Sequence, residues 1–76
     1  MAAAQQAFVV PVGDLWVVKV GGVEKSERYA LQSTAITFAR TWLRMSGGGE
    51  LVILGEDGKI RDKDTVAPGN DPRGNG

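Results

Sequence analysis

Residues 7–22 read AFVVPVGDLWVVKVGG, in which two apolar runs are separated by Gly13 and Asp14. Both runs are rich in β-branched and aromatic residues, and a short break containing glycine is typical of a tight turn between antiparallel strands. The segment is therefore predicted to form a β-hairpin. The two glycines that end the second run predict another turn directly after it.

The second apolar run, residues 15–20, is apolar on both of its faces. Side chains alternate across a strand, so Trp16 and Val18 share one face. We expect Trp16 at the centre of the face that meets the helix, because one large aromatic side chain covers area that several smaller ones would otherwise fill. Leu15 and Val17 lie on the opposite face, which is a candidate surface for contact with another protein.

A helix is predicted within LQSTAITFARTWLRMSGGG, residues 31–49. Apolar residues recur there at helical spacing, with Ser33 as the predicted N-cap and Gly47 as the residue that ends the helix. The predicted core combines this helix with the strands. Its members are Trp16, Val18, Ile36, Ala39, Leu43 and Ile53.

Further strands are predicted on both sides of the helix. Residues 25–31, KSERYAL, are a candidate third strand, more polar than the first two. After the helix, strands at residues 50–54 and 59–64 are joined by a turn at Asp57 and Gly58. This order predicts an α+β fold, in which a small antiparallel sheet of hairpin, candidate third strand and second hairpin carries one α-helix packed on one face.

The length of 76 residues allows one domain. We expect a flexible N-terminus over residues 1–6, a single α+β domain over 7–66 and a mobile C-terminal tail over 67–76, because the tail has hardly any apolar side chain to hold it. A chain of this size buries only about 60% of the surface that it exposes when unfolded. Its stability must therefore come from a well-packed core or from association with another chain.

The composition excludes several classes of function. The chain has no cysteine and no histidine, which removes disulfide bonds, the usual zinc sites and the commonest catalytic base, and leaves only carboxylates and lysines as bases. Asp62 and Asp64 flank a lysine, a pattern more typical of a charged surface than of a cation site. We therefore expect no catalytic residues, no metal site and no cofactor. The lack of cysteine and of any signal or membrane-spanning stretch favours the cytoplasm, without membrane contact.

Four segments resemble a family of small bacterial and phage proteins catalogued as domain of unknown function 2188. The segments are FVVPVGDLWVVKVGG, STAITFARTWLR, GELVILGEDGKIRDKDT and the closing GNDPRG, which together lie within residues 7–74. The residues at the expected positions are Trp16, Ala35, Ala39, Asp57, Gly58, Ile60 and Arg61. Phe38 and Trp42 are bulkier than the residues usual at their positions. The resemblance implies no activity.

A second apolar stripe runs along the predicted helix, where Phe38, Trp42 and Met45 recur at i, i+4 and i+7. The usual explanation is that the sheet curls and buries both stripes. The alternative is that these side chains stay exposed and anchor another protein. With Leu15 and Val17, they form the predicted protein interface.

Basic residues form a second candidate site. Lys59, Arg61 and Lys63 alternate along the last predicted strand and are expected to project from one face, while Arg40 and Arg44 are neighbours on the helix. These five residues are the predicted nucleic-acid contacts. A solvated edge strand also explains such lysines, and the intervening acidic residues would repel phosphates. The order of strands and helix is similar to the integrase-arm and plant-type domains that bind DNA with a three-stranded sheet.

These observations lead to two hypotheses. The first is a cytoplasmic, non-enzymatic protein-interaction module, which acts as a homodimer, with another protein, or as an accessory protein of a phage or other mobile element. The alternative is a nucleic-acid-binding domain that uses the sheet or the basic last strand. The zero net charge favours the first, because most nonspecific binders of nucleic acid depend on an overall positive charge.

Overall fold

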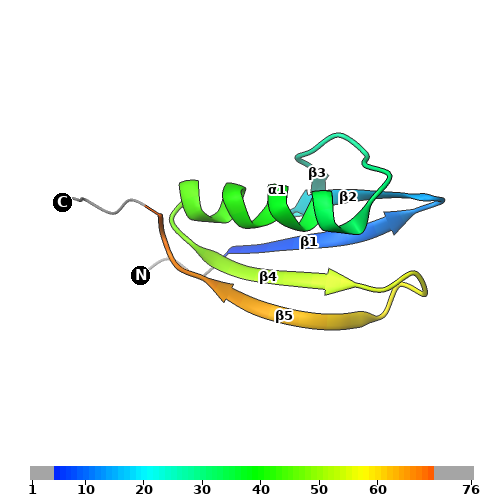
Figure 1. Cartoon of the computed structure of the whole chain (residues 1–76). Helices are drawn as coiled ribbons and strands as arrows, with labels where there is room; N and C mark the ends of the chain where they lie inside the picture. Colours follow the sequence, from blue (N-terminus) through cyan, green and yellow to red (C-terminus); the bar gives the residue numbers. More distant parts are fainter. Residues whose placement is uncertain (1–4, 70–76) are drawn as a thin grey trace.

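The computed structural model describes residues 5–69, which form five strands and one helix (Figure 1). In chain order the elements are β1 (Gln5–Val12), β2 (Leu15–Val20), β3 (Val23–Glu24), α1 (Gln32–Met45), β4 (Gly49–Leu54) and β5 (Ile60–Val66). The strands form one sheet, and α1 lies across one of its faces. The fold is therefore α+β, as the sequence predicts.

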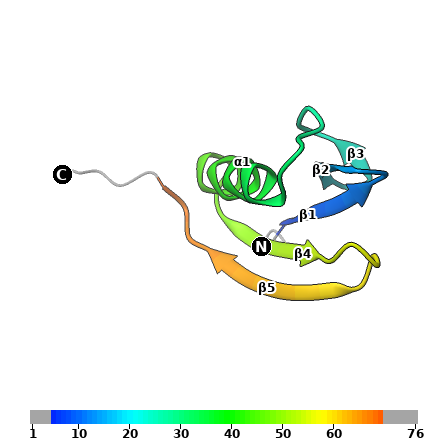
Figure 2. The same cartoon turned by 45° about the vertical axis from the view of Figure 1, so that its right-hand side comes forward.

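The sheet has the strand order β3-β2-β1-β4-β5. Three of the four neighbouring pairs are antiparallel, but β1 and β4 are parallel, with Ala7 opposite Leu51. The sheet is thus mixed, which corrects the expectation of an antiparallel sheet. The reason is the crossover: α1 runs back across the sheet against the direction of β1, and the chain then reverses, so β4 runs alongside β1 (Figures 1 and 2).

The first hairpin forms as predicted. Residues Val12 and Leu15 pair across a two-residue turn, and Gly13 has a φ of 60°. This left-handed conformation is favourable for glycine and strained for most other residues. A two-residue turn that begins with a glycine of positive φ matches the right-handed twist of the two strands that it joins.

The third strand differs from the sequence expectation. It comprises only Val23–Glu24, and the segment predicted as a strand, residues 25–31, is irregular apart from one bridge between Trp16 and Tyr29. Each residue of this bridge donates a backbone hydrogen bond to the other, at 2.8 and 2.7 Å. Between β3 and the bridge, the hydroxyl of Ser26 accepts a hydrogen bond from the backbone N–H of Val18 at 2.9 Å. The Ser26 hydroxyl thus accepts the hydrogen bond of a backbone N–H of β2 that a regular third strand would otherwise accept.

The helix begins earlier than predicted and ends where expected. Its N-cap is Leu31, which makes no side-chain capping bond, so the assignment of Ser33 as N-cap is wrong. At the other end, the backbone N–H of Gly48 donates to the carbonyl of Leu43 at 2.6 Å, while Gly47 has a φ of 98°. This is the hydrogen bond of a Schellman motif, which ends a helix at a residue in the left-handed conformation.

Both ends of the described chain make contacts with the end of α1. The strand β1 begins inside the segment predicted to be flexible, and the side-chain amide of Gln5 donates to the carbonyls of Ser46 and Gly48 at 2.8 and 3.2 Å. The backbone N–H of Gly69 donates to the carbonyl of Arg44 at 2.9 Å. The rest of the predicted flexible terminus and tail, residues 1–4 and 70–76, lies outside the described residues.

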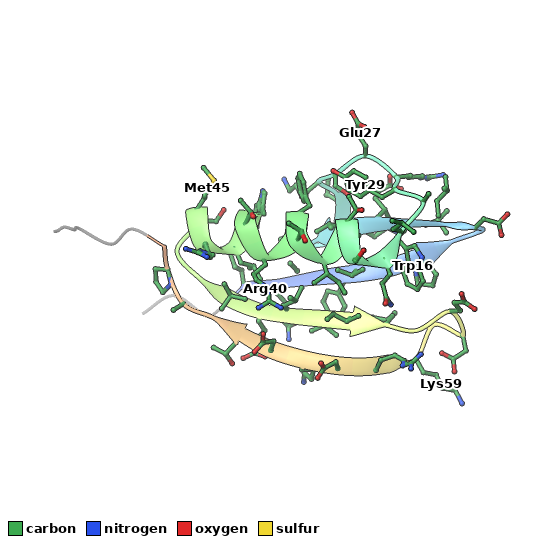
Figure 3. The ribbon with its side chains drawn as sticks, in the orientation of Figure 1. Trp16, Glu27, Tyr29, Arg40, Met45 and Lys59 are labelled. Carbon is green, nitrogen blue, oxygen red and sulfur yellow. The ribbon has the colours of Figure 1, made fainter. Side chains whose placement is uncertain are left out.

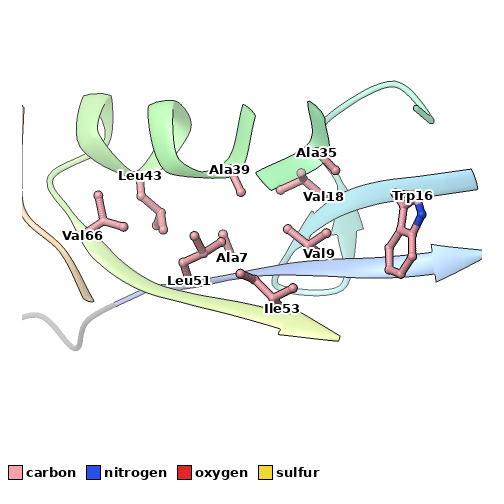
Figure 4. Close-up of a cluster of buried hydrophobic side chains, with 10 residues drawn as sticks. All are labelled: Ala7, Val9, Trp16, Val18, Ala35, Ala39, Leu43, Leu51, Ile53 and Val66. Carbon is pink, nitrogen blue, oxygen red and sulfur yellow. The ribbon is translucent and has the colours of Figure 1, made fainter. Parts of the chain in front are cut away.

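The core lies between α1 and the sheet (Figure 4). Its buried members are Ala7, Val9, Trp16, Val18, Ala35, Ala39, Leu43, Leu51, Ile53 and Val66. All of the predicted core residues are buried here except Ile36, which is half-buried and packs against the cluster. Trp16 lies at one end of the core, near the start of the helix, rather than at its centre.

Candidate functional site

The two faces of the sheet have different environments. The helix covers one face, and no other element of residues 5–69 covers the opposite face, which we call the outer face (Figures 1 and 2). Because side chains alternate along each strand, those between the core positions point toward the outer face. The register of the strands therefore shows which residues share it.

The middle of the outer face is apolar. Its apolar residues, which we call the outer patch, are Phe8, Val10, Val12, Leu15, Val17, Val52, Leu54 and Ile60. Val17 and Val52 are only 0% and 1% exposed, although the helix lies on the other side. Their neighbours on adjacent strands shield them, because cross-strand side chains are only about 5 Å apart. The patch is thus a closed apolar surface with exposed parts at Leu15 and at Ile60, which is 58% exposed.

Charged side chains border the outer patch. One row of paired residues crosses the whole outer face and consists of Glu24, Lys19, Phe8, Val52 and Lys63. The row is therefore charged at both edges and apolar in the middle. Two residues before Val52 in β4, Glu50 lies on the same face and accepts a hydrogen bond from the hydroxyl of Thr65 at 2.9 Å. A polar rim around an apolar centre is the usual anatomy of a protein interface.

The charge on Glu24 is supported by a neighbouring guanidinium. Arg28 donates a hydrogen bond to the Glu24 carboxylate at 3.0 Å, and both side chains are exposed. This hydrogen bond holds the pKa of Glu24 below its usual value and raises the pKa of Arg28. Glu24 is therefore ionised at neutral pH. Its carboxylate can accept further hydrogen bonds, because its two oxygens offer about four acceptor positions.

The structure divides the predicted protein interface between two places. Leu15 and Val17 belong to the outer patch, whereas Phe38 and Trp42 are half-buried and pack against the core on the helix side. The ring of Phe38 lies 6.3 Å from that of Tyr29, centroid to centroid. Met45 is 82% exposed and points away from the sheet (Figure 3). These five residues therefore do not form one surface.

The prediction that Lys59, Arg61 and Lys63 project from one face is wrong. The pairing of β4 with β5 shifts near Leu54, so that Arg61 is an extra residue between two paired positions. Such a bulge breaks the alternation of side chains. Arg61 lines a surface hollow with Trp16 on the helix side, Lys63 lies on the outer face, and Lys59 precedes the strand in the turn (Figure 3).

The two helix arginines also lie apart from these residues. Arg40 donates a hydrogen bond to the carboxylate of Asp64 at 2.7 Å, and this pair links α1 to the helix side of β5. Arg44 is exposed and lies beside Pro68, after the end of β5. The five predicted nucleic-acid contacts are thus spread over the helix side, the outer face and a turn.

Sequence reasoning identified only two members of the outer patch. It missed the six others, which are Phe8, Val10, Val12, Val52, Leu54 and Ile60. For Phe8, Val10 and Val12 the sequence does carry a signal. Both sets of alternating positions in the first apolar run are apolar, so both faces of that strand are apolar. Which strands lie beside this run depends on the parallel pairing of β1 with β4, and that pairing has no local signal.

Residues 5–69 lack two other features that would indicate a function. No helix there is long and apolar enough to cross a membrane. In the same part of the chain, no three acidic side chains gather closely enough to hold a metal ion.

Comparison with known proteins identifies one family. The model of the family described as uncharacterized protein conserved in bacteria (DUF2188) matches residues 7–66. The match begins within β1 and ends at the last residue of β5, whereas the resemblance noted in the sequence extends to residue 74. No curated protein and no solved structure matches the chain. Because the family model covers most of its 76 residues, the chain belongs to the DUF2188 family.

Proposed function

We propose that this protein is a protein-interaction module whose outer face docks against an apolar surface of another chain. The observation that carries the proposal is the outer patch, which no element of residues 5–69 covers. The patch extends over four strands, about 19 Å, and about 13 Å along β1. With its side chains it presents roughly 300–400 Å², which is the size of the largest apolar patch on a typical monomer and is often functional.

The distribution of charge supports a protein partner over a nucleic acid. The outer face carries both signs at its rim, with Lys19 and Lys63 balanced by Glu24 and Glu50. A surface that follows a phosphate backbone needs a continuous positive stripe, because the contacts are made to repeated negative charges. The bulge at Arg61 instead separates the basic residues of the last strand.

The same proposal includes the cellular setting and the absence of catalysis. A chain without cysteine or histidine suits the reducing cytoplasm and lacks the commonest general base, histidine, and the thiol nucleophile. We therefore propose a cytoplasmic, non-enzymatic role, either in the bacterial cell itself or as an accessory protein of a phage or other mobile element.

Site-specific photo-crosslinking tests the docking role. The photoreactive amino acid p-benzoylphenylalanine replaces Ile60, which is exposed on the outer face, or Met45, which is 82% exposed on the helix and serves as the matched control. Both positions are open to solvent and accept a large side chain. Irradiation is done in cells and on the purified chain.

We expect a discrete adduct from position 60 that is absent from position 45. The adduct should disappear when Val10 in the middle of the outer patch is replaced by lysine, because a charge there must be desolvated on docking. Circular dichroism of the Val10→Lys variant checks that the fold is kept. No adduct from position 60, or the same adducts from both positions, would overturn the proposal.

A further inference from the structure

We infer that the partner of the outer face is a second copy of this chain, arranged about a two-fold axis that runs parallel to the strands. This inference rests on the proposed docking role of the outer face and specifies its occupant. Two observations support it: the size of the face and the order of charges across it.

The size of the face suits stacking of two identical sheets. The five strands lie about 4.8 Å apart and differ in length, from two residues in β3 to eight in β1, with a mean of about six, which gives a face of roughly 480 Å². Two such faces together bury about 1,000 Å², which is the lower limit for a stable and specific interface. Packed sheets are about 10 Å apart, a distance that the apolar side chains of the outer patch fill from both sides.

The row of paired residues determines the direction of the axis. β1 is the central strand of the sheet, so a two-fold axis along it places β3 of one chain opposite β5 of the other. In this arrangement Glu24 faces Lys63 of the partner subunit, and symmetry repeats the contact at the opposite edge. Packed sheets cross at about 30°, which displaces these edges by about 5 Å, a distance that a flexible lysine spans.

A second pair of charges agrees with the same arrangement. Lys19 on β2 lies over β4 of the partner, where Glu50 is the residue that precedes Val52 on the same face. Lys19 can therefore reach the partner's Glu50, while the middle of the interface brings Phe8 against Phe8 of the partner subunit. Each of the four charged residues of the outer face obtains a partner of opposite sign, which favours this register over others.

The other two-fold arrangement lacks this complementarity. An axis perpendicular to the strands places each strand opposite its own copy, so Lys63 faces the partner's Lys63 and Glu24 faces the partner's Glu24. Sliding the sheets to separate these like charges moves the lysines over the outer patch, where they would be desolvated without a counter-ion.

Charge reversal tests the arrangement on the full chain. Sedimentation equilibrium, from micromolar to near-millimolar concentration, measures the dimer dissociation constant of the wild type and of the variants Glu24→Lys, Lys63→Glu and the double reversal. Lys59→Glu is the matched control, since it makes the same change of charge in the turn outside the outer face. All of these positions are exposed, so the fold should be kept, and circular dichroism checks it.

We expect the wild type to dimerise and each single reversal to raise the dissociation constant at least about tenfold, because symmetry places two repulsive pairs in each dimer. The double reversal should restore the wild-type value, and the control should leave it unchanged. A wild type that stays monomeric, or a double reversal no tighter than the single ones, would overturn the inference.

Sedimentation and crosslinking together distinguish failure of the docking role from failure of the second copy as its occupant. If the wild type is monomeric but the photoreactive residue at position 60 forms a discrete adduct with a different protein, the docking role stands and the second copy is the wrong occupant. If the wild type is monomeric and no adduct forms at position 60, both proposals fail. An adduct of twice the chain mass, formed by the purified protein, supports both.

Discussion

Trp16 connects three parts of the molecule. Its side chain is buried at the end of the core near the start of α1, and its backbone exchanges two hydrogen bonds with Tyr29 in the segment between β3 and the helix. This residue therefore holds the irregular segment against the sheet as well as filling the core. In a domain with so small an interior, each such side chain contributes a large fraction of the free energy of unfolding.

Replacement of Trp16 by alanine should lower the free energy of unfolding by about 3–5 kcal/mol, the usual cost of removing a buried large aromatic side chain. Urea unfolding followed by circular dichroism measures the change. Leu31→Ala is the control, since Leu31 is 63% exposed and its truncation should cost little. Equal midpoints for the two variants would contradict the placement of Trp16 in the core.

Two neighbouring glycines after the helix differ in what surrounds them. Gly47 and Gly48 both have positive φ, at 98° and 88°, so alanine at either should cost about 1–2 kcal/mol in backbone strain. A Cβ at Gly48 would also lie 2.8 Å from the carbonyl oxygen of Val66, whereas nothing lies within 4 Å at Gly47. We expect Gly48→Ala to be less stable than Gly47→Ala by about 1–3 kcal/mol, the usual cost of overpacking.

Thermal and urea unfolding of the two glycine variants give this difference directly. The strain is common to both, so the comparison isolates the contact between the turn and the end of β5. Equal stabilities would mean that this contact is looser than the structure shows.

The start of α1 lacks side-chain capping interactions. Leu31 has the extended backbone of an N-cap but no side-chain oxygen, and the first turn has no acidic residue. A serine hydroxyl at this position can accept a hydrogen bond from a free N–H of the first turn. Leu31→Ser should therefore raise the free energy of unfolding by about 1 kcal/mol.

The control for this capping variant is Leu31→Ala, which removes the same apolar surface without adding an acceptor. Urea unfolding of both variants separates the capping bond from the loss of the leucine. A serine variant no more stable than the alanine variant would contradict the assignment of Leu31 as the N-cap.

Local patterns in the sequence predicted the elements better than their ends. The hairpins and the helix follow from alternating or helical spacing of apolar residues and from glycine at the turns. The third strand was misplaced because the hydroxyl of Ser26 takes a backbone donor of β2, a contact that no spacing reveals. The single face expected for Lys59, Arg61 and Lys63 fails for a similar reason, since the bulge at Arg61 depends on pairing with β4.

The sequence predicted the class of fold but not the topology of the sheet. Val17 is apolar in the sequence, yet only the pairing of β1 with both β2 and β4 places it within a continuous apolar surface. The crossover joins residues far apart in the chain, such as Phe8 and Val52, and local patterns carry no information about such a pair. The outer patch is therefore a property of the assembled sheet.

A dimer formed through the outer face would make the stability depend on protein concentration. Association that requires the folded chain stabilises it by mass action, and each tenfold rise in concentration adds about 1.4 kcal/mol per dimer. The thermal midpoint should then rise by about 3–6 °C for each tenfold increase. Differential scanning calorimetry of the wild type and of Lys63→Glu measures this, and the variant should show a smaller rise.

The central position of β1 also has a consequence for how the chain folds during synthesis. β1 and β2 leave the ribosome together and can pair at once, but the other edge of β1 stays open until β4 has been made, after the helix and its three glycines. Open strand edges attract other open edges, and pairings between distant segments form slowly. The nascent chain is thus most prone to aggregation in the interval between the synthesis of β2 and that of β4, and shortening that interval by faster translation of α1 should increase its soluble yield.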